Sequence, residues 1–323
     1  MSAPERMVRT LHQGIDEVPP GRRAVALGTF DGVHRGHQAV IAAAHAAGER
    51  LGASTMAATF HPRPATVIRP GTPPNALAGI TERIRMLYRA GADEVVVMRF
   101  TPELAALSAR DFVEQILVGR FGAIAIAVGE DFRFGHDRLG GTDALHDICD
   151  PLGVEVEAVA LLGDDGEKIS SSRIRGLISE GEMQEAARLL GRLPSLDGVV
   201  GHGDRRGREI GFPTANLQVV PGQQLPAEGV YAGWATLMPG EQRYPAAISV
   251  GRNPHFGDVD DLRIEAHLLD YDGAEIYDRP LRLDFHSLVR GQAVYPTLEA
   301  LVAQIAADVE ETRRRTADGG AQR

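Results

Sequence analysis

The sequence predicts an α/β domain with a parallel, doubly wound sheet, followed by an antiparallel β-barrel domain with a C-terminal helix. In the first half, short apolar segments alternate with helical segments, which is typical of parallel strands joined by crossover helices. In the second half, short segments of alternating polarity are separated by Gly and Pro, which indicates an antiparallel barrel. The pattern changes near Gly191–Pro194, so we expect domains of residues 1–190 and 191–323.

The short apolar segments of the first half have the Val and Ile content of strands that are covered on both faces. We expect strands at Ala24–Gly28, Thr55–Phe60, Glu94–Met98, Ala123–Val128 and Val154–Ala160, and helices at Gly36–Ala47, Thr81–Ala90, Ala109–Val118 and Thr142–Asp150. Ligands of such sheets bind at the carboxyl ends of the strands. Functional residues should therefore follow the ends of these strands.

The first half ends with helical segments, and short strands follow in the second half. The expected helices are Arg173–Ser179 and Met183–Leu190, and the expected strands are Gly229–Thr236, Tyr244–Val250, Leu262–Asp270 and Leu281–Phe285. A last amphipathic stretch, Thr297–Thr312, has apolar residues at helical spacing and predicts a final helix.

Composition and charge limit the classes of function. The chain has 323 residues, of which 43% are hydrophobic and 24% charged, and this suits a globular protein of two domains. The net charge of -10 argues against a binder of nucleic acid or of anionic membranes, because both require an excess of Lys and Arg. Cys149 is the single cysteine, so no intrachain disulfide forms. No signal peptide or membrane span is recognisable, and we expect a soluble cytoplasmic protein.

A glycine-rich string follows the first expected strand and leads into the first expected helix. It reads GTFDGVHRGH, from Gly28 to His37. A strand, a glycine-rich turn and a helix start together bind anions, because unpaired backbone N–H groups and the helix dipole point at the ligand. His34 and His37 are close enough in sequence to donate hydrogen bonds to one cluster of phosphates. A lone glycine-rich turn is usually only a turn, but the whole string in this context favours a nucleotide site.

A second segment with hydroxyl and basic side chains precedes the helix Arg173–Ser179. It reads KISSSRIR, from Lys168 to Arg175. The hydroxyl groups could serve only as a helix N-cap. Capping requires neither Lys168 nor Arg175, so we favour a phosphate clamp that includes Ser171 and Ser172.

The barrel half contains the string GREIGFPTAN, from Gly207 to Asn216. If this segment is extended, Thr214 and Asn216 lie on one face. Their hydroxyl and amide oxygens are hard ligands that suit Mg²⁺ with bound phosphates. The alternative is a turn in which the Asn side chain bonds its own backbone.

Alternation in the expected strand Leu262–Asp270 puts Arg263, Glu265 and His267 on one face, opposite the core. From the pattern alone, Glu265 could simply be part of a solvated ion pair, which contributes little to stability.

These strings resemble known families. The pattern GxFDGxHxGH is similar to the signature of the nucleotidyltransferase superfamily, and its full form is similar to bacterial FAD synthetases. The string from Gly207 to Asn216 resembles the riboflavin kinase motif GRxxGxPTAN. The chain is thus identified as a member of the bacterial bifunctional riboflavin kinase/FAD synthetases, with a resemblance that covers Ala24 to Asp308.

The resemblance implies a nucleotidyltransferase domain, a riboflavin kinase domain and two sets of site residues. In the first domain, His34 and His37 are catalytic, and FHP at Phe60, His61 and Pro62 lies beside the flavin, as do Asp131 and Phe134. ATP and phosphate are bound by Gly28, Phe30, Asp31, Gly36, Lys168, Ser171, Ser172 and Arg175, and in the second domain by Gly207 and Arg208. Glu265 is the catalytic base there, and Thr214 and Asn216 hold the metal.

The sequence departs from the family pattern at several positions. Ser172 replaces threonine, and Asp131 replaces asparagine, which adds negative charge near the expected phosphates. In the second half the departures are Leu193-Pro194 for Pro-Tyr, Arg252 and His255 for threonines, Asp278 for glycine, and Val294-Tyr295 for Lys-Phe.

We therefore expect phosphorylation of riboflavin to FMN and adenylylation of FMN to FAD, with ATP as co-substrate and Mg²⁺ as cofactor. The expected partners are these small molecules, with neither nucleic acid nor membrane, and a weak homo-oligomer stays open. One alternative is an FMN adenylyltransferase whose barrel only binds flavin. Two others are a transferase for another phosphate-bearing substrate and a flavin-binding regulator.

Overall fold

The computed structural model describes residues 9–68, 71, 74–164, 166–202, 206–240, 242–253 and 258–317. The chain forms two compact units. The first comprises Met1–Pro74 and Ile80–Ser171, and the second comprises Asn75–Gly79 and Ser172–Arg323.

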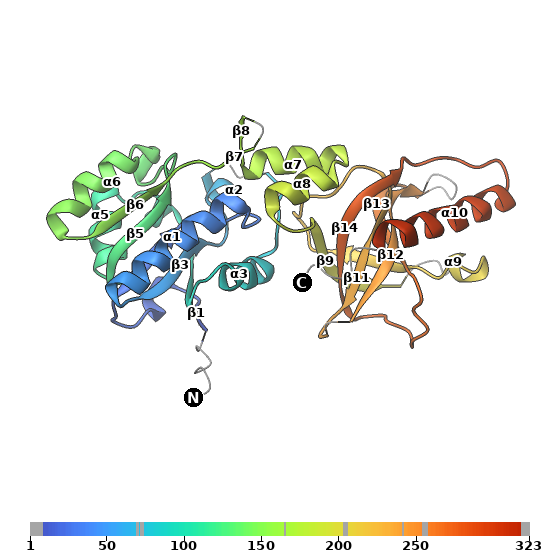
Figure 1. The fold of residues 1–323 in the computed structure, drawn as a ribbon, viewed down its shortest axis with the longest axis horizontal. Helices are drawn as coiled ribbons and strands as arrows, with labels where there is room; N and C mark the ends of the chain where they lie inside the picture. The colour runs from blue at the N-terminus through green and yellow to red at the C-terminus, as the bar shows by residue number, and fades with distance from the viewer. Residues whose placement is uncertain are drawn as a thin grey trace. The chain divides into compact units, whose positions relative to one another are not determined.

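The first unit is built on a parallel sheet in the strand order β1-β4-β3-β2-β5-β6 (Figure 1). Its strands are β1 (Thr10–His12), β2 (Arg23–Leu27), β3 (Ser54–Phe60), β4 (Glu94–Met98), β5 (Ala123–Gly129) and β6 (Glu155–Val159). The chain runs from β2 toward one edge through β3 and β4, and then toward the other edge through β5 and β6. The order therefore reverses beside β2, and a ligand is expected at the carboxyl ends of the strands at this point.

Helical segments connect these strands. They are α1 (Arg35–Leu51), α2 (Pro64–Ile68), α3 (Ile80–Arg89), α4 (Pro102–Ala105), α5 (Ala109–Asp111), the π-helical η2 (Phe112–Val118) and α6 (Thr142–Cys149), with short 3-10 turns η1 (Ile15–Glu17), η3 (His136–Arg138) and η4 (Asp150–Leu152). A two-stranded hairpin, β7 (Gly163–Asp164) and β8 (Glu167–Lys168), ends the unit.

Alternate residues of β2 serve two different layers of the core. Val25 and Leu27 lie in the large cluster that η2 and α6 also line, whereas Ala24 packs with Ala47 of α1 and Ala125 of β5. Small side chains on this second face let α1 lie close to the sheet. Figure 1 shows α1 in front of the strands. The sheet is thus covered on both faces, as the apolar strands predict.

The second unit is a closed barrel in which every strand pair is antiparallel, in the order β10-β13-β12-β11-β14-β9. The strands are β9 (Ser195–Gly201), β10 (Ala215–Val219), β11 (Gly229–Leu237), β12 (Arg243–Asn253), β13 (Asp258–Leu268) and β14 (Pro280–Arg290). The helices of this unit are α7 (Ser171–Glu180), α8 (Met183–Leu190), α9 (Arg206–Glu209) and α10 (Leu298–Thr316).

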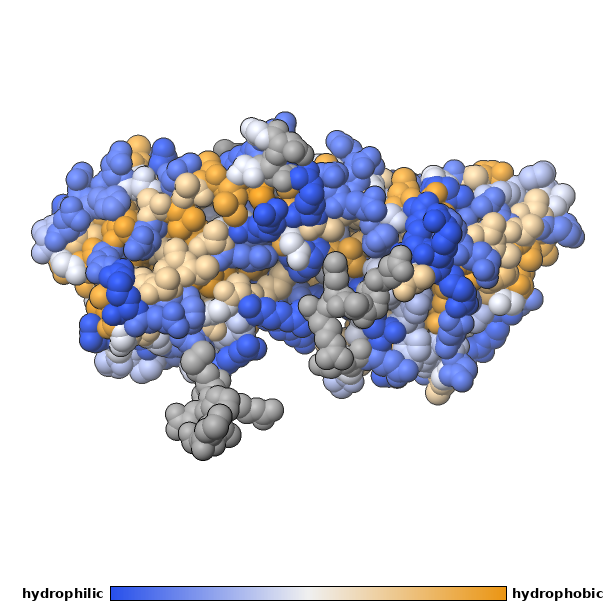
Figure 2. Space-filling view, viewed as in Figure 1, coloured by the Kyte–Doolittle hydropathy of each residue, from blue (hydrophilic) through white to orange (hydrophobic). Residues whose placement is uncertain are grey.

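Helix α10 packs against β11, β12 and β14 (Figure 1). Thr297 caps its first turn by accepting a hydrogen bond from Ala300 N–H. Asp308 of α10 is buried and ion-paired with Arg290 of β14 at 2.7 Å, which fixes the helix to the barrel. Figure 2 shows this helix changing from hydrophobic residues in its first half to hydrophilic ones in its last turns, where basic side chains complement the helix dipole.

A short segment from within the first half of the sequence is part of the second unit. Ala76 forms a parallel β-bridge with Gln223. Its N–H donates to Gly222 O at 2.7 Å, and its carbonyl accepts from Gln224 N–H at 2.8 Å. Ala76 thereby joins residues 75–79 to the loop that follows β10.

The expected fold class is confirmed. Every strand expected in the first half forms, while β1 was not expected because three residues at a sheet edge give too short a pattern. In the barrel, β9 and β10 were not expected: β9 carries Gly198 and Gly201, which interrupt its alternation. Among the helices of the described residues, none has the length and apolar character that crossing a membrane requires.

Candidate active sites

The glycine-rich turn after β2 has an unusual backbone. Phe30 and Val33 have positive φ values of 50° and 40°, as does Gly32 at 82°. Such values cost a non-glycine residue about 1–3 kcal/mol and persist only where the surroundings impose them. Here both side chains are 1% exposed, and Val33 N–H donates to Phe30 O at 3.2 Å. The turn is held at the carboxyl end of β2, where the strand order reverses.

His34 and His37 lie together at the start of α1. His34 is the N-cap, and its Nδ1 accepts from His37 N–H at 3.4 Å. The two imidazole rings stack with centroids 3.6 Å apart, and the Phe30 ring meets His37 edge-on at 5.4 Å. Burial lowers the pKa of His37 well below its usual value, and the charges of His34 and Arg83 lower it further. His37 is therefore a neutral imidazole at pH 7, suited to donating hydrogen bonds without carrying charge.

The exit of β3 lies against the same turn. Arg63 forms an ion pair with the buried carboxylate of Asp31 at 2.9 Å, which joins the segment after Phe60 to the glycine-rich turn. Burial lowers the pKa of His61, and Arg83 and Arg63 lower it further. The expected neighbours Asp31, Phe60 and His61 therefore lie in one region of the first unit.

Asp131 and Lys168 form an ion pair, and both side chains are about half exposed. The negative charge that Asp131 adds is thus balanced by Lys168, a residue of the basic segment. Phe134 is buried and stacks on Phe132 with ring centroids 5.6 Å apart. This loop presents an aromatic pair next to a charge-balanced pair.

The basic segment is divided between the two compact units. Ser171, in the first unit, donates from Oγ to the Asp31 carbonyl at 2.9 Å. Ser172 and Arg175 follow it in α7 and belong to the second unit, where Arg175 Nε donates to Asn75 O at 2.7 Å. Of the expected phosphate clamp, Ser171 is therefore hydrogen-bonded to the glycine-rich turn, and Lys168 is ion-paired with Asp131 in the same unit.

The second group of residues lies on neighbouring barrel strands. Asn216 of β10 is directly opposite Glu265 of β13. Thr214 Oγ1 donates to Glu265 Oε2 at 3.4 Å. Ile264, Ala266 and Leu268 are buried, so Glu265 lies on the outer face as the alternation predicts. Hydroxyl, amide and carboxylate oxygens meet here, a donor set that fits Mg²⁺.

The segment before Thr214 is held in place by β13 and by a close backbone contact. His267 Nδ1 donates to Pro213 O at 2.8 Å. Gly207 leaves no room for a side chain, because an added Cβ would lie 2.3 Å from Phe212 O. Arg208 is ion-paired with Glu275 at 3.1 Å, and both are exposed. The geometry of the GREIGFPTAN string thus depends on its glycine and on His267.

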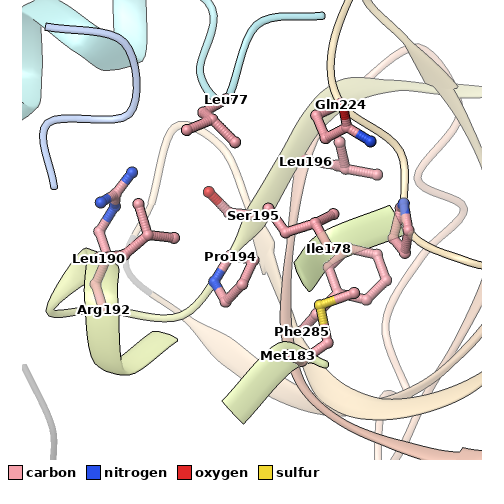
Figure 3. A pocket seen from close by; sticks show the side chains of 11 residues that line it. Leu77, Ile178, Met183, Leu190, Arg192, Pro194, Ser195, Leu196, Gln224 and Phe285 are labelled. Atoms are coloured by element: carbon pink, nitrogen blue, oxygen red, sulfur yellow. The ribbon is translucent and has the colours of Figure 1, made fainter. Parts of the chain in front are cut away.

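Two of the positions that depart from the family pattern have a structural explanation. Asp278 adopts φ 59°, a conformation that glycine and, to a lesser degree, Asp tolerate. Pro194 lines a small cavity that Figure 3 shows among α7, α8, β9 and β14, together with Ile178, Met183 and Phe285. Its volume of about 10 Å³ leaves room for about one water molecule, and Pro194 is buried beside it. His255 lies outside the described residues.

Arg63, Arg83 and His267 belong to these sites but were not expected as site residues. For Arg83 the sequence does contain a signal. It lies on the apolar face of the expected helix Thr81–Ala90, one turn before the buried Leu87. A charged residue in such a position needs a partner or a function.

The fold and the two groups of residues define a transferase with an α/β nucleotide-binding unit and a separate barrel site. Comparison with known proteins is consistent with this class. The family model for FAD synthetase matches residues 17–173, and that for riboflavin kinase matches residues 190–316.

The chain belongs to the bifunctional riboflavin kinase/FMN adenylyltransferase family. It is 36% identical to the protein of that name from Pseudomonas fluorescens, over 95% of this chain and 97% of the relative. It is 32% identical to the one from Escherichia coli (strain K12), over 94% and 95%. A solved structure described as a macrolide-efflux protein from Streptococcus pneumoniae matches with a TM-score of 0.84 and 31% identity, over 95% of this chain and 99% of that one.

Proposed function

We propose that this chain phosphorylates riboflavin to FMN and then joins FMN to the adenylyl group of ATP, giving FAD and pyrophosphate. Family membership over both halves supports the pair of activities. We assign adenylylation to residues 1–190 and phosphorylation to residues 191–323. Both reactions consume ATP, and the proposal includes a cytoplasmic location.

In the adenylylation, a phosphate oxygen of FMN attacks the α-phosphorus of ATP, and the bond to the leaving pyrophosphate breaks. The nucleophile is already an anion, so this step requires no general base. It requires positioned donors and positive charge around the phosphates. The neutral His37, together with His34, Lys168, Ser171, Ser172 and Arg175, is assigned to this task. The strained turn supplies backbone N–H groups beside them.

In the phosphorylation, the 5′-hydroxyl oxygen of riboflavin attacks the γ-phosphorus of ATP, and ADP leaves. The hydroxyl must lose its proton, and Glu265 is assigned as the base that accepts it. Thr214 and Asn216 would hold Mg²⁺, which supplies positive charge to the phosphates. No comparable base is assigned to the first site, in keeping with its different nucleophile.

The observation that carries the kinase assignment is the pairing of Asn216 and Glu265 across β10 and β13, with Thr214 Oγ1 3.4 Å from Glu265. A barrel that only bound flavin would have no use for a carboxylate beside two oxygen ligands. This supports a working kinase over the alternative of a monofunctional adenylyltransferase.

The test is product analysis by chromatography of the whole chain with ATP and Mg²⁺, supplied with riboflavin or with FMN. FMN and FAD from riboflavin are expected. FAD from FMN with riboflavin unchanged would identify the monofunctional alternative. Absence of product from both would overturn the proposal.

A further inference from the structure

Arg83 of α3 is a buried arginine in the first unit that no catalytic assignment above uses. Its side chain is 1% exposed. Burial lowers its pKa from the usual value, while the charge of Asp31 acts in the opposite direction. In the described part of the chain, no carboxylate oxygen lies within ion-pair distance of Arg83. The carboxylate whose charge acts on it, Asp31, is ion-paired with Arg63 at 2.9 Å.

The guanidinium donates to the ends of two neighbouring parallel strands. Nη1 lies 3.2 Å from Thr29 O and 3.1 Å from Phe60 O. Thr59 Oγ1 donates to the same Thr29 carbonyl at 3.0 Å. Because a trans peptide directs its C=O and N–H in opposite directions, the N–H of Phe30 points away from Arg83. Arg83 and Thr59 thus set the orientation of the peptide at which the positive φ of the turn begins.

Retaining an arginine here is costly unless the charge is used. Desolvation of a buried charge is unfavourable, and hydrogen bonds to carbonyls offset only part of that cost. The packing role alone could be filled by an apolar side chain of similar length, such as Met. The positive charge of Arg83 lies at the carboxyl ends of β2 and β3, next to the turn assigned to phosphates. There it would attract an anionic ligand more strongly than an exposed charge could.

We propose that Arg83 is a positioning residue for adenylyl transfer: it holds the Thr29–Phe30 peptide in place and provides a fixed positive charge for the phosphates bound at the turn. This inference rests on the proposed first site. It does not require Arg83 to touch the substrate. In the proposed role, loss of the charge lowers the rate of FAD formation but not the stability; in a purely structural role, the rate would fall only as far as the folded fraction does.

The test compares Arg83→Met, Arg83→Lys and Arg89→Met in the full chain. Arg89 lies on the same helix and is exposed, so Arg89→Met is a control for an equal change in net charge. For each, kcat and KM for ATP and FMN are measured in FAD formation, along with the thermal midpoint. FMN formation from riboflavin normalises the concentration of active protein.

We expect Arg83→Met to melt within a few degrees of wild type or above it, because replacing a buried charge by an apolar group is often neutral or stabilising. FAD formation should fall on the order of 10²-fold in kcat/KM, the loss typical of one preorganised electrostatic group. Arg83→Lys should recover at least a tenth of the wild-type value. Arg89→Met should match wild type.

A folded Arg83→Met variant with wild-type FAD formation would overturn the inference. So would a rate that falls only in proportion to the folded fraction, since that indicates a structural role. If the Met variant does not fold, Arg83→Lys decides: a folded Lys variant that loses 10²-fold rules out the charge as the source of the effect. Failure of wild type to form FAD would instead overturn the proposed function itself.

Discussion

Asn216 and Glu265 face each other across the pair of strands β10 and β13, and their side chains lie on the outer face of the barrel. This register places the carboxylate proposed as the base next to the amide proposed as a metal ligand. Replacing Glu265 by Gln keeps the size of the side chain and removes the base. We expect FMN formation to fall by about 10²–10⁴-fold, the usual contribution of general base catalysis. FAD formation from supplied FMN should be unchanged.

The measurement is the initial rate of each reaction with the same protein preparation. Glu299→Gln, an exposed carboxylate in the first turn of α10, is the matched control. Loss of both activities in a folded Glu265→Gln protein would contradict the assignment of two separate sites.

His37→Ala should have the reverse effect. Removing one positioned donor typically costs about 10²–10³-fold in rate, and here the loss should be confined to FAD formation. Phosphorylation of riboflavin should continue at the wild-type rate. His45→Ala on the same helix serves as the control, because that ring is bonded to Thr55 and lies outside the turn. Unchanged FAD formation in His37→Ala would remove the histidine from the site.

The pKa of His37, lowered by burial, by His34 and by Arg83, predicts a pH dependence. Its usual value is about 6.5, so the folded protein binds a proton there only at lower pH. The rate of FAD formation should stay constant through pH 6.5 and fall only at lower pH, where the pH approaches the lowered pKa and the imidazole becomes charged. A pH–rate profile checks this, and the midpoint should move upward in Arg83→Met, because the repelling charge is gone.

The same lowered pKa affects stability, with a definite sign. The unfolded chain takes up a proton at His37 at higher pH than the folded chain does. The free energy of unfolding should therefore decrease as pH falls from about 6.5 toward the folded-state pKa. The pKa of His61 is also lowered, so its protonation in the unfolded chain adds to the decrease. Thermal midpoints of His37→Ala should depend less on pH than those of wild type; an equal dependence would show that protonation of His37 is not the cause.

The ion pair of Asp131 and Lys168 predicts a non-additive pair of substitutions. Lys168→Met leaves the Asp131 carboxylate unbalanced near the phosphates and should raise KM for ATP. Adding Asp131→Asn should restore part of that loss. Both side chains are about half exposed, so neither change should move the thermal midpoint appreciably. KM for ATP is measured for the wild type, the two single variants and the double variant, which form a double-mutant cycle. Strictly additive effects on KM would show that the two residues are not coupled.

Gly207→Ala tests the geometry of the second site. The new Cβ would lie 2.3 Å from Phe212 O, so the loop before Thr214 must move. We expect FMN formation to fall at least tenfold while FAD formation from FMN is kept, since a misplacement of about 1 Å can cost 10²-fold. Gly211→Ala is an informative comparison: its φ of 86° strains the backbone although no atom is near. Equal activity of Gly207→Ala and wild type would mean that the loop accommodates the methyl group.

The sequence predicts β2 to β6 because most of their residues are apolar, whereas β1, with three residues, was not expected. It predicts Thr214, Asn216 and Glu265 on common faces because a period of two depends only on local geometry. The register that pairs Asn216 with Glu265 is a relation between distant segments, which local patterns do not contain. The same holds for the ion pair of Arg63 with Asp31 and for the hydrogen bond from His267 to Pro213, both of which join separate parts of the chain.

The strain at Phe30 and Val33 was also hidden from the sequence. Bulky and β-branched residues avoid positive φ, so nothing in their identity indicates it. The structure explains the strain at Phe30, because Arg83 and Thr59 both donate hydrogen bonds to the carbonyl of Thr29, the preceding residue. The burial of Arg83 could be expected from its helical position, but the two carbonyls that it contacts could not.

Ala76 forms hydrogen bonds with Gly222 and Gln224, so the barrel unit includes residues 75–79, which are synthesised long before its strands. A cut made anywhere between residues 80 and 190 would separate that piece covalently from the strands it binds. A barrel fragment expressed on its own would lack residues 75–79. The Gly222 carbonyl and the Gln224 N–H would then have to form hydrogen bonds with water. Circular permutants and gene fusions that aim to keep this unit whole must therefore carry residues 75–79 along with the strands.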